Sequence, residues 1–404
     1  MSTALLKTAP ALHAPQADSA IDIATELAQR FAVSANARDQ AGGHAAQERE
    51  WIRDSGLLAL SIPTAFGGQG ADWPTICNTI RILARADSAL AHVYGFHHLQ
   101  LAGIQLYGTA QQQRELLTQT VDQRLFWGNA LNPLDRRTTA IADTQGDGFL
   151  LDGIKSFSSG SVGSDWLTVS AWNAQTRSAM IGVLPTRQPG VSVQPDWDAF
   201  GQRQTDSGNV HFKQVPLPKA QVLLAPGQAP TPQATLRSQV AQLIMANLYL
   251  GIGEGAFEAA RHYTMNEARP WFASGVEQAA ADPLIQHRYG QLWLRLRPAA
   301  VLADHAAQEL EHLFRKGARL TARERGELAI AVAAAKCLSH AAGLEVSSQM
   351  FELTGARSTS AKYGYDRFWR NVRVHTLHDP IDYKLRDLGR YALDRSLPEP
   401  TAYS

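Results

Sequence analysis

Two histidines three residues apart, His375 and His378, stand in the stretch NVRVHTLHDPIDYK, residues 371–384. On a helical segment this spacing places both rings on roughly the same side. Pro380 disfavours helix at Asp379, so a helix is expected to end beside the second ring. Two imidazoles so placed are able to bind a metal, to exchange protons, or to serve separate packing roles. The HxxH spacing favours no metal, because no third ligand follows at a motif distance.

A second histidine group occurs in AHVYGFHHLQL, where His92 and Phe96 are four residues apart and predict one shared helix face. Taken alone, this pair is more typical of a core histidine beside a core aromatic ring than of a functional site. His97 and His98 point away from each other, and hydrogen bonding between helices is the default interpretation for both.

The composition excludes several classes of protein. Among 404 residues, Lys+Arg 38 against Asp+Glu 37 leaves a net charge of +1, so no broad basic face for nucleic acid is predicted. Cys77 and Cys337 form no CxxC or Cys/His cluster, which argues against a disulfide framework or structural zinc and is consistent with a cytoplasmic location. Neither the N-terminus nor the apolar run ELAIAVAAAKCLSHAAGLEV predicts a secretory signal or a membrane span, since charged residues interrupt the run.

Periodicity divides the chain into zones. Apolar residues recur at helical spacing from about residue 21 to 119, short alternating runs with Gly, Asp and Pro follow to about 224, and long helical segments return from about 235. We therefore expect a mainly α, α+β multidomain protein: a flexible arm (1–17), an N-terminal helical domain (18–122), a central antiparallel β domain (123–233), and a C-terminal four-helix bundle with its tail (234–404).

Five phrases in this order resemble the acyl-CoA dehydrogenase superfamily over roughly residues 20–395. They are GLLALSIPTAFGGQG, GFLLDGIKSFSSGSVGSDWL, FGQRQTDSGNVHFKQVPLP, NEARPWF and QMFELTGAR. The resemblance implies an acyl-CoA dehydrogenase-like fold, but a fold does not settle the reaction.

The sequence departs from the dehydrogenases where they place a glutamate base. One family position reads His378-Asp379-Pro380 here, and the other, on the first bundle helix, offers Ala246 and Asn247. Asp379 is shorter than glutamate and adjoins a proline, and proton abstraction depends first on geometry. The β domain reads NALNPLDRRTTAIAD, without the acidic and Gly-Ser-Asp elements of a thioester site.

The replacements AHVYGFHHLQL, FWGNALNP, KSFSSGS, DWDAFGQRQTDSG and HTLHDP resemble the flavin-dependent monooxygenases on this fold, a branch that includes dibenzothiophene monooxygenase and relatives acting on organosulfur compounds. The resemblance implies reduced FMN, supplied by a separate NAD(P)H:flavin reductase, which reacts with O2 through a C4a-(hydro)peroxide and oxygenates a small organosulfur or thiophene-type substrate. FAD is the alternative cofactor, and no metal is implied.

The resemblance also assigns residues. His92, Ser159 and His378 would be catalytic, with Ser159 and His378 donating hydrogen bonds to the peroxide. Phe96 and Trp127 would wall the substrate pocket; Phe96 stands where dibenzothiophene monooxygenase has Tyr. Cofactor contacts would come from Phe96, Asn129, Ala130, Leu131, Asn132, Pro133, Leu134, Lys155, Ser156, Phe157, Ser158, Ser159, Trp197, Ser207, Arg269, Ala356, Arg357 and His378.

Arg269 and Arg357 would bind the FMN phosphate, because a guanidinium fork matches phosphate oxygens. In the dehydrogenases these regions reach the flavin across a subunit boundary, so the resemblance implies a homotetramer made as a dimer of dimers. The polar stretch 131–140 is either a lid over the flavin or an ordinary surface loop.

Three other functions remain open at this point. They are an oxygenase acting on nitrogen or aromatic carbon, an atypical acyl-CoA dehydrogenase with Asp379 as base, and a non-enzymatic relative that keeps only the fold. The identity of the substrate and the role of His375, beyond support, are left undetermined by the sequence.

Overall fold

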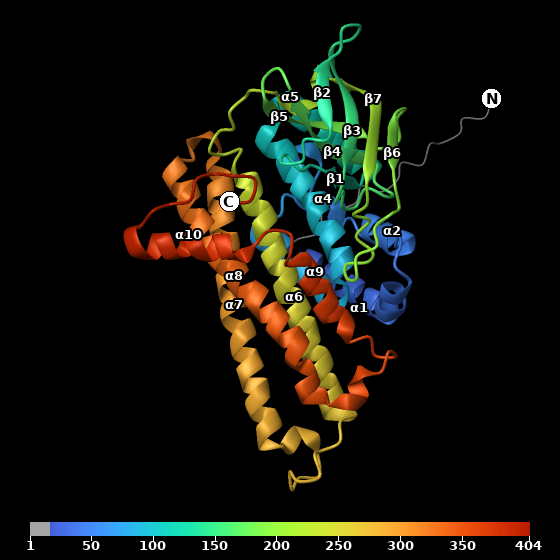
Figure 1. The fold of residues 1–404 in the computed structure, drawn as a ribbon, viewed down its shortest axis with the longest axis vertical. Coiled ribbons are helices and arrows are strands. Elements are labelled where there is room, and N and C mark those ends of the chain that lie inside the picture. Colours follow the sequence, from blue (N-terminus) through green and yellow to red (C-terminus); the bar gives the residue numbers. More distant parts are fainter. Residues whose placement is uncertain (1–16) are drawn as a thin grey trace, which may run out of the picture.

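The computed structural model describes residues 17–404, and it places a β domain against one end of an elongated helical body (Figure 1). The predicted N-terminal arm lies outside the described residues, except that residue 17 begins the first helix. The N-terminal helical zone is confirmed and comprises α1 (Ala17–Ala41), α2 (Ala46–Asp54), α3 (Trp73–Ala86), α4 (Ser88–Tyr107) and α5 (Ala110–Gln123).

Local sequence signals explain where the helices that matter for the site begin. The Asp87 carboxylate accepts hydrogen bonds from the backbone N–H groups of Ala89 and Leu90, each at 3.1 Å, and so caps α4. The Pro/Gly-rich connection before α3 turns sharply: a Cβ on Gly68 would lie 2.1 Å from the carbonyl oxygen of Ile62, so only glycine fits there.

The central zone forms an eight-stranded sheet with the order β6-β7-β3-β2-β4-β5-β8, and β1 pairs with β4. Most pairs are antiparallel, as predicted, but β1 runs parallel to β4 and β2 touches β4 in parallel. No hairpin joins β1 to β4, so the alternating pattern of each strand carries no sign of this pairing. The strands are β1 (Trp127–Ala130), β2 (Thr139–Ala142), β3 (Gly148–Lys155), β4 (Trp166–Asn173), β5 (Ser178–Pro185), β6 (Val191–Val193), β7 (Val210–Pro218) and β8 (Val222–Leu224).

The C-terminal bundle contains the long helices α6 (Leu236–Asn266), α7 (Pro283–Lys316) and α8 (Ala322–Thr354). The shorter helices α9 (Asp366–His375) and α10 (Ile381–Asp394) follow, and α9 packs on α6 and α8 while α10 packs on α8. The break predicted from Pro380 falls at residues 376–380, but α9 ends at the first ring, His375, and not beside the second ring, His378.

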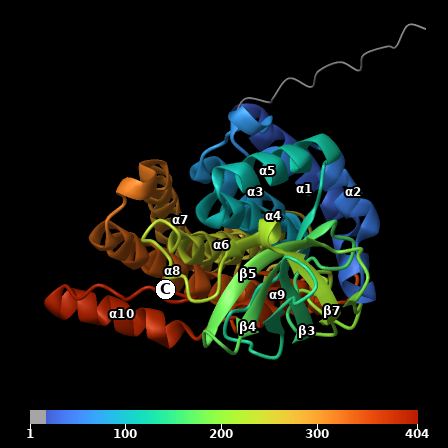
Figure 2. The same cartoon turned by 90° about the horizontal axis from the view of Figure 1, so that it is seen from above.

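The two helical zones share one hydrophobic core. Ile80 of α3, Tyr94 of α4 and Leu243 of α6 belong to the same buried cluster, whereas the sheet has a separate core around Leu151 and Val169. Figure 2 shows α4 and α6 in the middle of the molecule, between the sheet and the outer helices. The helix α4 therefore lies where the N-terminal domain, the sheet and the bundle meet.

Two helices, α6 and α8, are long and apolar enough to cross a membrane by composition alone. In α6, 83% of the apolar window is buried inside the protein, and in α8 the share is 56%. Both are core helices of the bundle, as the charged interruptions in the α8 sequence predicted.

Close contact between α6 and α3 depends on glycine, because a Cβ on Gly255 would lie 2.2 Å from the carbonyl oxygen of Arg85. We expect Gly255→Ala to lower the free energy of unfolding by about 1–3 kcal/mol, since the two backbones must separate. Gly389→Ala on α10, where no atom lies within 4 Å of the new Cβ, should instead raise it by about 0.5–1 kcal/mol. Urea denaturation followed by circular dichroism measures both, and equal midpoints would contradict the packing argument.

Candidate active site

His92 and Phe96 lie on one buried face of α4, as their spacing predicts. Their rings are stacked with centroids 4.1 Å apart and planes 17° from parallel. Both side chains are buried, with 5% of each residue's surface exposed. An aromatic wall therefore fixes the plane of the His92 ring.

His375, at the end of α9, is the histidine that contacts His92. A hydrogen bond joins Nδ1 of His92 to Nε2 of His375, and the ring centroids lie 4.6 Å apart. The Tyr249 hydroxyl of α6 donates to the backbone carbonyl of His375 at 3.0 Å and also lies 3.4 Å from its Nδ1. A supporting role was predicted for His375, and this contact identifies the ring that it supports.

The hydrogen bonds that link Tyr249, His375 and His92 indicate which ring nitrogen carries the proton in each histidine. The single Tyr249 proton goes to the carbonyl, so Nδ1 of His375 must carry the proton in the second contact. Nε2 of His375 then accepts from Nδ1–H of His92. Nε2 of His92 is left as a bare acceptor, and it is a buried atom with no hydrogen-bond partner among the described residues.

Burial keeps this pair uncharged. Burial is the main cause that lowers the pKa of His92 to about 3, and the neighbouring His378 adds to it. Burial likewise holds the pKa of His375 well below its ordinary value, with further contributions from the two other histidines. At neutral pH both rings are neutral, so each ring carries a single proton, on Nδ1.

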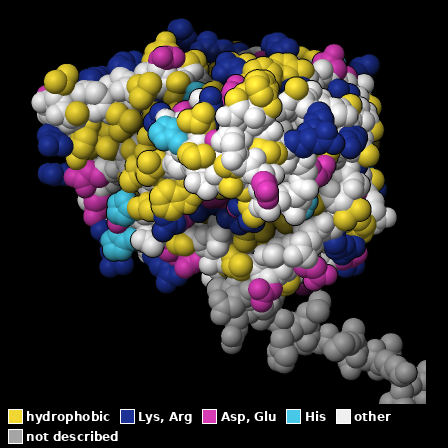
Figure 3. Space-filling view, turned by 90° about the horizontal axis from the view of Figure 1, so that it is seen from below, with side chains coloured by type: hydrophobic (Ala, Val, Ile, Leu, Met, Phe, Trp, Pro, Cys, Tyr) yellow, Lys and Arg dark blue, Asp and Glu magenta, His cyan; other side chains and the backbone are white. Residues whose placement is uncertain are grey.

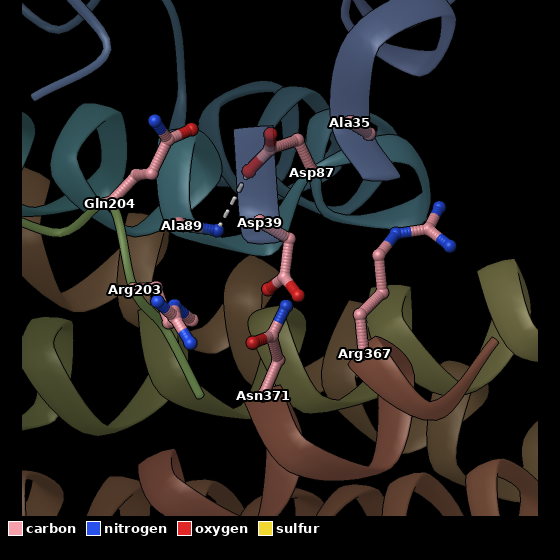
Figure 4. A pocket seen from close by; sticks show the side chains of 8 residues that line it. All are labelled: Ala35, Asp39, Asp87, Ala89, Arg203, Gln204, Arg367 and Asn371. Carbon is pink, nitrogen blue, oxygen red and sulfur yellow. Dashed lines mark hydrogen bonds between the residues drawn. The ribbon is translucent and has the colours of Figure 1, made fainter. Parts of the chain in front are cut away.

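Gln202 bridges the start of α4 and the middle of α9, because its side-chain amide donates to the Ser88 hydroxyl at 3.2 Å and its backbone N–H donates to Asn371. Asp87, the α4 cap, pairs with Arg38 at 2.6 Å, and Asn371, one turn before His375, accepts a hydrogen bond from the backbone N–H of Gln202 at 2.6 Å. Figure 4 shows that Asp87 and Asn371 line one small space, with a cavity of about 10 Å³. That volume is about enough for a single water molecule.

The β domain reaches α4 next to His92. The Ser159 hydroxyl lies 2.8 Å from that of Ser207, and the Ser159 carbonyl accepts from the backbone N–H of Asn129 at 2.9 Å. At the following residue, Gly160, a Cβ would lie 3.7 Å from the side chain of Val93, the neighbour of His92. Asn129, Ser159 and Ser207, predicted from three separate phrases, are thus brought together at the edge facing α4.

Lys155 ties the stretch 131–140 to β3. Its ammonium group donates to the carbonyls of Asn132 and Asp135, at 2.9 Å and 2.5 Å. Burial lowers the pKa of Lys155 to about 8. The predicted flavin contact of Lys155 stays a prediction, because in this conformation its ammonium group holds the loop backbone. The same bonds hold the loop against the end of β3, and its role as a lid stays a prediction.

The aromatic ring of Phe157 is exposed on the surface of the protein. It is 70% exposed, has a φ of 55°, and its ring meets Trp197 edge-on with centroids 5.9 Å apart. The Trp197 indole N–H is bonded to the Gln202 carbonyl at 2.8 Å, so the ring is fixed. A positive φ in a bulky residue is strained, and such strain concentrates at ligand sites.

Arg269 and Arg357 lie together at the opposite end of the bundle and are exposed there, as is Ala356. The hydroxyl of Tyr363 donates to Glu267 at 2.6 Å and joins the two connections that carry these arginines. The distance from Tyr249 to the end of α6 is about 25 Å by helix rise. The arginines therefore do not reach the histidines of their own chain.

Three other predicted or noted residues serve packing. Trp127 is buried with its indole N–H bonded to Thr120 at 2.9 Å, so the proposed pocket role is not supported by its position. His97 bonds the Leu58 carbonyl at 2.8 Å, and His98 bonds the Ser61 hydroxyl at 2.7 Å. Both tie α4 to the segment before α3 rather than to another long helix.

The positions of a dehydrogenase base hold no free carboxylate. Asp379 is buried and pairs with Lys336 at 2.6 Å and with Nδ1 of His378 at 3.1 Å. Burial alone would raise the pKa of Asp379, but the bonds from His378 and Lys336 hold it well below its usual range. Asn247 is engaged by Arg81 at 2.7 Å, and Ala246 has no acid group. In the sequence, Lys336 stands out only as a charge that interrupts an apolar run. A lysine at such a buried position indicates a partner of opposite charge.

The arrangement fits a flavin better than a metal. Within residues 17–404 no group of three or more His, Cys, Asp or Glu side chains is placed to bind a metal ion. The unpartnered Nε2 of His92 suits a ligand N–H or O–H donor, and the exposed Phe157 ring suits an aromatic plane. A reduced isoalloxazine offers both features.

The chain matches three family models along its length. They are the acyl-CoA dehydrogenase N-terminal domain over residues 18–124, the middle domain over 131–215 and the C-terminal domain over 243–383. The chain is 46% identical to the probable FMNH2-dependent monooxygenase SfnC of Pseudomonas putida, covering 95% of this chain and 97% of the relative.

Two solved structures are similar over nearly their whole length. Methanesulfinate monooxygenase MsuC of Pseudomonas fluorescens is 46% identical with a TM-score of 0.93, covering 95% of this chain and 99% of that one. The complex of TdsC from Paenibacillus sp. A11-2 with FMN and indole is 38% identical with a TM-score of 0.92, covering 95% and 100%.

The neutral histidine pair predicts a dependence of stability on pH. Below the ordinary histidine pKa of about 6.5, the unfolded chain binds protons that the folded protein excludes, so stability falls as pH falls. We expect up to about 1.4 kcal/mol per pH unit for each histidine between pH 6.5 and 4. His375→Gln should reduce this slope in urea denaturation at several pH values, while His211→Gln, on the exposed surface of β7, should not. A slope unchanged by His375→Gln would show that the ring is charged in the folded state.

Proposed function

We propose that this chain, a member of the acyl-CoA dehydrogenase family and of its FMNH2-dependent monooxygenase branch, oxygenates a small organosulfur compound as one part of a two-component system. A separate NAD(P)H:flavin reductase would supply the reduced FMN, and O2 would be the second substrate. FAD remains the alternative cofactor. The proposal keeps the expected cytoplasmic location, where NAD(P)H is available to such a reductase.

The observation that carries the proposal is the state of the three groups around α9. His92 offers a buried, unpartnered acceptor, His378 is partly exposed beside it, and Asp379 is held as an ion pair. An acyl-CoA dehydrogenase requires a free carboxylate to remove a proton, and neither family position provides one. Oxygen transfer requires hydrogen-bond donors and acceptors without a strong base, and the site supplies those.

Each residue has a distinct part in this proposal. Bound reduced FMN supplies the reaction with O2 that gives the oxygen-transferring C4a-(hydro)peroxide. His92 accepts a hydrogen bond from the flavin or its adduct through Nε2, and Phe96 fixes the plane of that ring. His378 and the Ser159 hydroxyl donate hydrogen bonds to the developing oxygen charge. The loop 131–140, held by Lys155, excludes water from the adduct.

The names of the relatives support a sulfur substrate. One similar structure is a methanesulfinate monooxygenase, and TdsC is described as a dibenzothiophene monooxygenase. These substrates differ greatly in size, so we propose the class and no single compound. Since TdsC is also described with bound indole, oxygenation of an aromatic carbon is the second candidate.

A second subunit would complete the cofactor site. Arg269 and Arg357 are exposed about 25 Å or more along the bundle from Tyr249, which exceeds the reach of one FMN molecule. Near them Trp271 and Phe272 are 69% and 86% exposed. Figure 3, which looks at this end of the molecule, shows hydrophobic and basic side chains next to each other on the surface. A homotetramer in which these arginines bind the FMN phosphate of another chain would account for both features.

Stopped-flow mixing of the protein and anaerobically reduced FMN with oxygenated buffer tests the reaction. We expect a flavin-oxygen adduct absorbing in the near ultraviolet that outlives the oxidation of free FMN. His92→Ala and His378→Ala should shorten its lifetime by about 10²-fold or more, because each removes a proton donor or acceptor. The exposed His211→Ala variant serves as the control and should behave as the parent protein.

Two outcomes would contradict the proposal. Direct reoxidation of the flavin at the rate of free flavin would contradict the oxygenase reaction. Anaerobic turnover of an acyl-CoA with an artificial electron acceptor would instead identify a dehydrogenase. If the adduct forms, sulfides, sulfoxides, sulfones and sulfinates are the compounds whose oxygenated products should be sought first, with indole as the carbon comparison.

The phosphate role of the two arginines predicts an effect on binding. Arg269→Ala and Arg357→Ala should each weaken FMN affinity by about 10- to 100-fold, the effect of losing a hydrogen bond to a charged group. Isothermal titration measures this, and Arg323→Ala on α8, whose guanidinium pairs with Glu327 at 3.0 Å, is the control. Affinity unchanged in both variants, with the oligomer intact by sedimentation, would exclude the shared phosphate site.

A further inference from the structure

Lys336 is a buried cation in the middle of α8. Only 1% of its side chain is exposed, and its ammonium group donates to Asp379 Oδ1 and to Gln242 Oε1, each at 2.6 Å. Gln242 comes from α6 and Asp379 from the turn between α9 and α10. One lysine therefore joins α8, α6 and the turn that carries His378.

The same oxygen of Asp379 serves both neighbours. Oδ1 accepts from Nζ of Lys336 at 2.6 Å and from Nδ1 of His378 at 3.1 Å. A carboxylate can only accept, so the proton of this contact lies on Nδ1 of His378. Nε2 of His378, on the other side of the ring, is then the nitrogen left for a ligand. Its ring is stacked over His375 with centroids 6.4 Å apart, and Tyr403 meets it edge-on at 5.6 Å.

We infer that Lys336 and Asp379 form a positioning pair that fixes the His378 tautomer and balances the charge next to it. The inference rests on the proposed function, in which the His378 ring, once it carries a second proton on Nε2, donates to the oxygen that develops charge. Asp379 on its own would favour a charged His378, and Lys336 on its own would oppose it. With both present, the ring faces a carboxylate whose charge is offset by a lysine.

An alternative is that the pair merely joins α8 to the α9–α10 turn. A structural link would be served equally well by two apolar side chains, because replacing a buried ion pair by hydrophobic residues is often neutral for stability. The difference lies in the third partner: the shared oxygen couples the lysine to a ring that lies next to the His92–His375 pair. Removing either charge must therefore change the proton equilibrium of the site, which a purely structural link would not do.

All titratable groups around His378 enter this balance. His92 and His375 remain neutral because of burial, and burial lowers the pKa of Lys384 to about 8, with Lys336 adding to the effect. Opposite or like charge within 4–6 Å moves a pKa by about 1–3 units. Tyr403 of the C-terminal segment meets His378 edge-on, whereas Tyr249 of α6 contacts His375 and His340 of α8 lies near Lys336 and Asp379.

The test compares the pH profile of four variants. Lys336→Met leaves Asp379 unbalanced and should move the midpoint of oxygenation against pH upward by at least one unit. Asp379→Asn leaves Lys336 unbalanced and should move it downward by a similar amount. The double variant Lys336→Met/Asp379→Asn should return near the parent midpoint, and it keeps the test valid if a single variant folds poorly. Lys219→Met is the control, because Lys219 and Asp147 form an exposed pair at 2.7 Å.

A second measurement needs no flavin. Solid-state ¹⁵N NMR of histidine-labelled protein, with His378 assigned through His378→Gln, reports which ring nitrogen carries the proton. We expect Nδ1–H in the parent protein and an increased doubly protonated fraction at pH 7 in Lys336→Met. An Nε2–H ring in the parent protein, or single variants that shift the midpoint in the same direction, would overturn the inference. Because this readout is independent of FMN, failure of the oxygenase proposal alone would leave the NMR result as expected.

Discussion

The contact between His92 and His375 is the constraint on which the rest of the site depends. A buried polar group without a partner is costly, so two buried imidazoles require each other and a third group to order their protons. Tyr249 supplies that group from α6, and Gln202 bridges Ser88 at the start of α4 and Asn371 of α9. Because α4 and α9 belong to different zones of the sequence, the shared helical core is what allows the contact to form.

Much of the fold was predictable because it follows from the hydrophobic periodicity and from the positions of Gly and Pro in the sequence. The helical zones, the strand-rich middle and the break before Pro380 agree with the structure. The parallel β1–β4 pairing and the single core across both helical zones were not predicted, since each depends on contacts between distant segments. A hydrophobic face on α3 or α6 shows that something covers it but does not identify the partner.

The candidate site was predictable only where a residue type by itself suggests chemistry. His92, Ser159, Asn129 and Ser207 were named from separate phrases, and the structure places the last three at one edge next to α4. Trp127 and Lys155 were named for the same reason, yet tertiary packing gives them core and loop contacts. Lys336 was not named, because a lysine acquires meaning only through the carboxylate that it meets.

The ionised state of Asp379 explains how one fold can serve two chemistries. In a dehydrogenase the corresponding region must present a carboxylate that gains a proton, whereas here the carboxylate is already engaged by a lysine and a histidine. The carboxylate of Asp379 therefore supports a neighbouring ring. In the proposed oxygenase this arrangement would favour a flavin–oxygen adduct, because the engaged Asp379 is not free to remove the proton that keeps the adduct from decaying. The buried histidine pair and the engaged Asp379 are thus parts of one electrostatic arrangement, in which hydrogen bonds hold protons in fixed places.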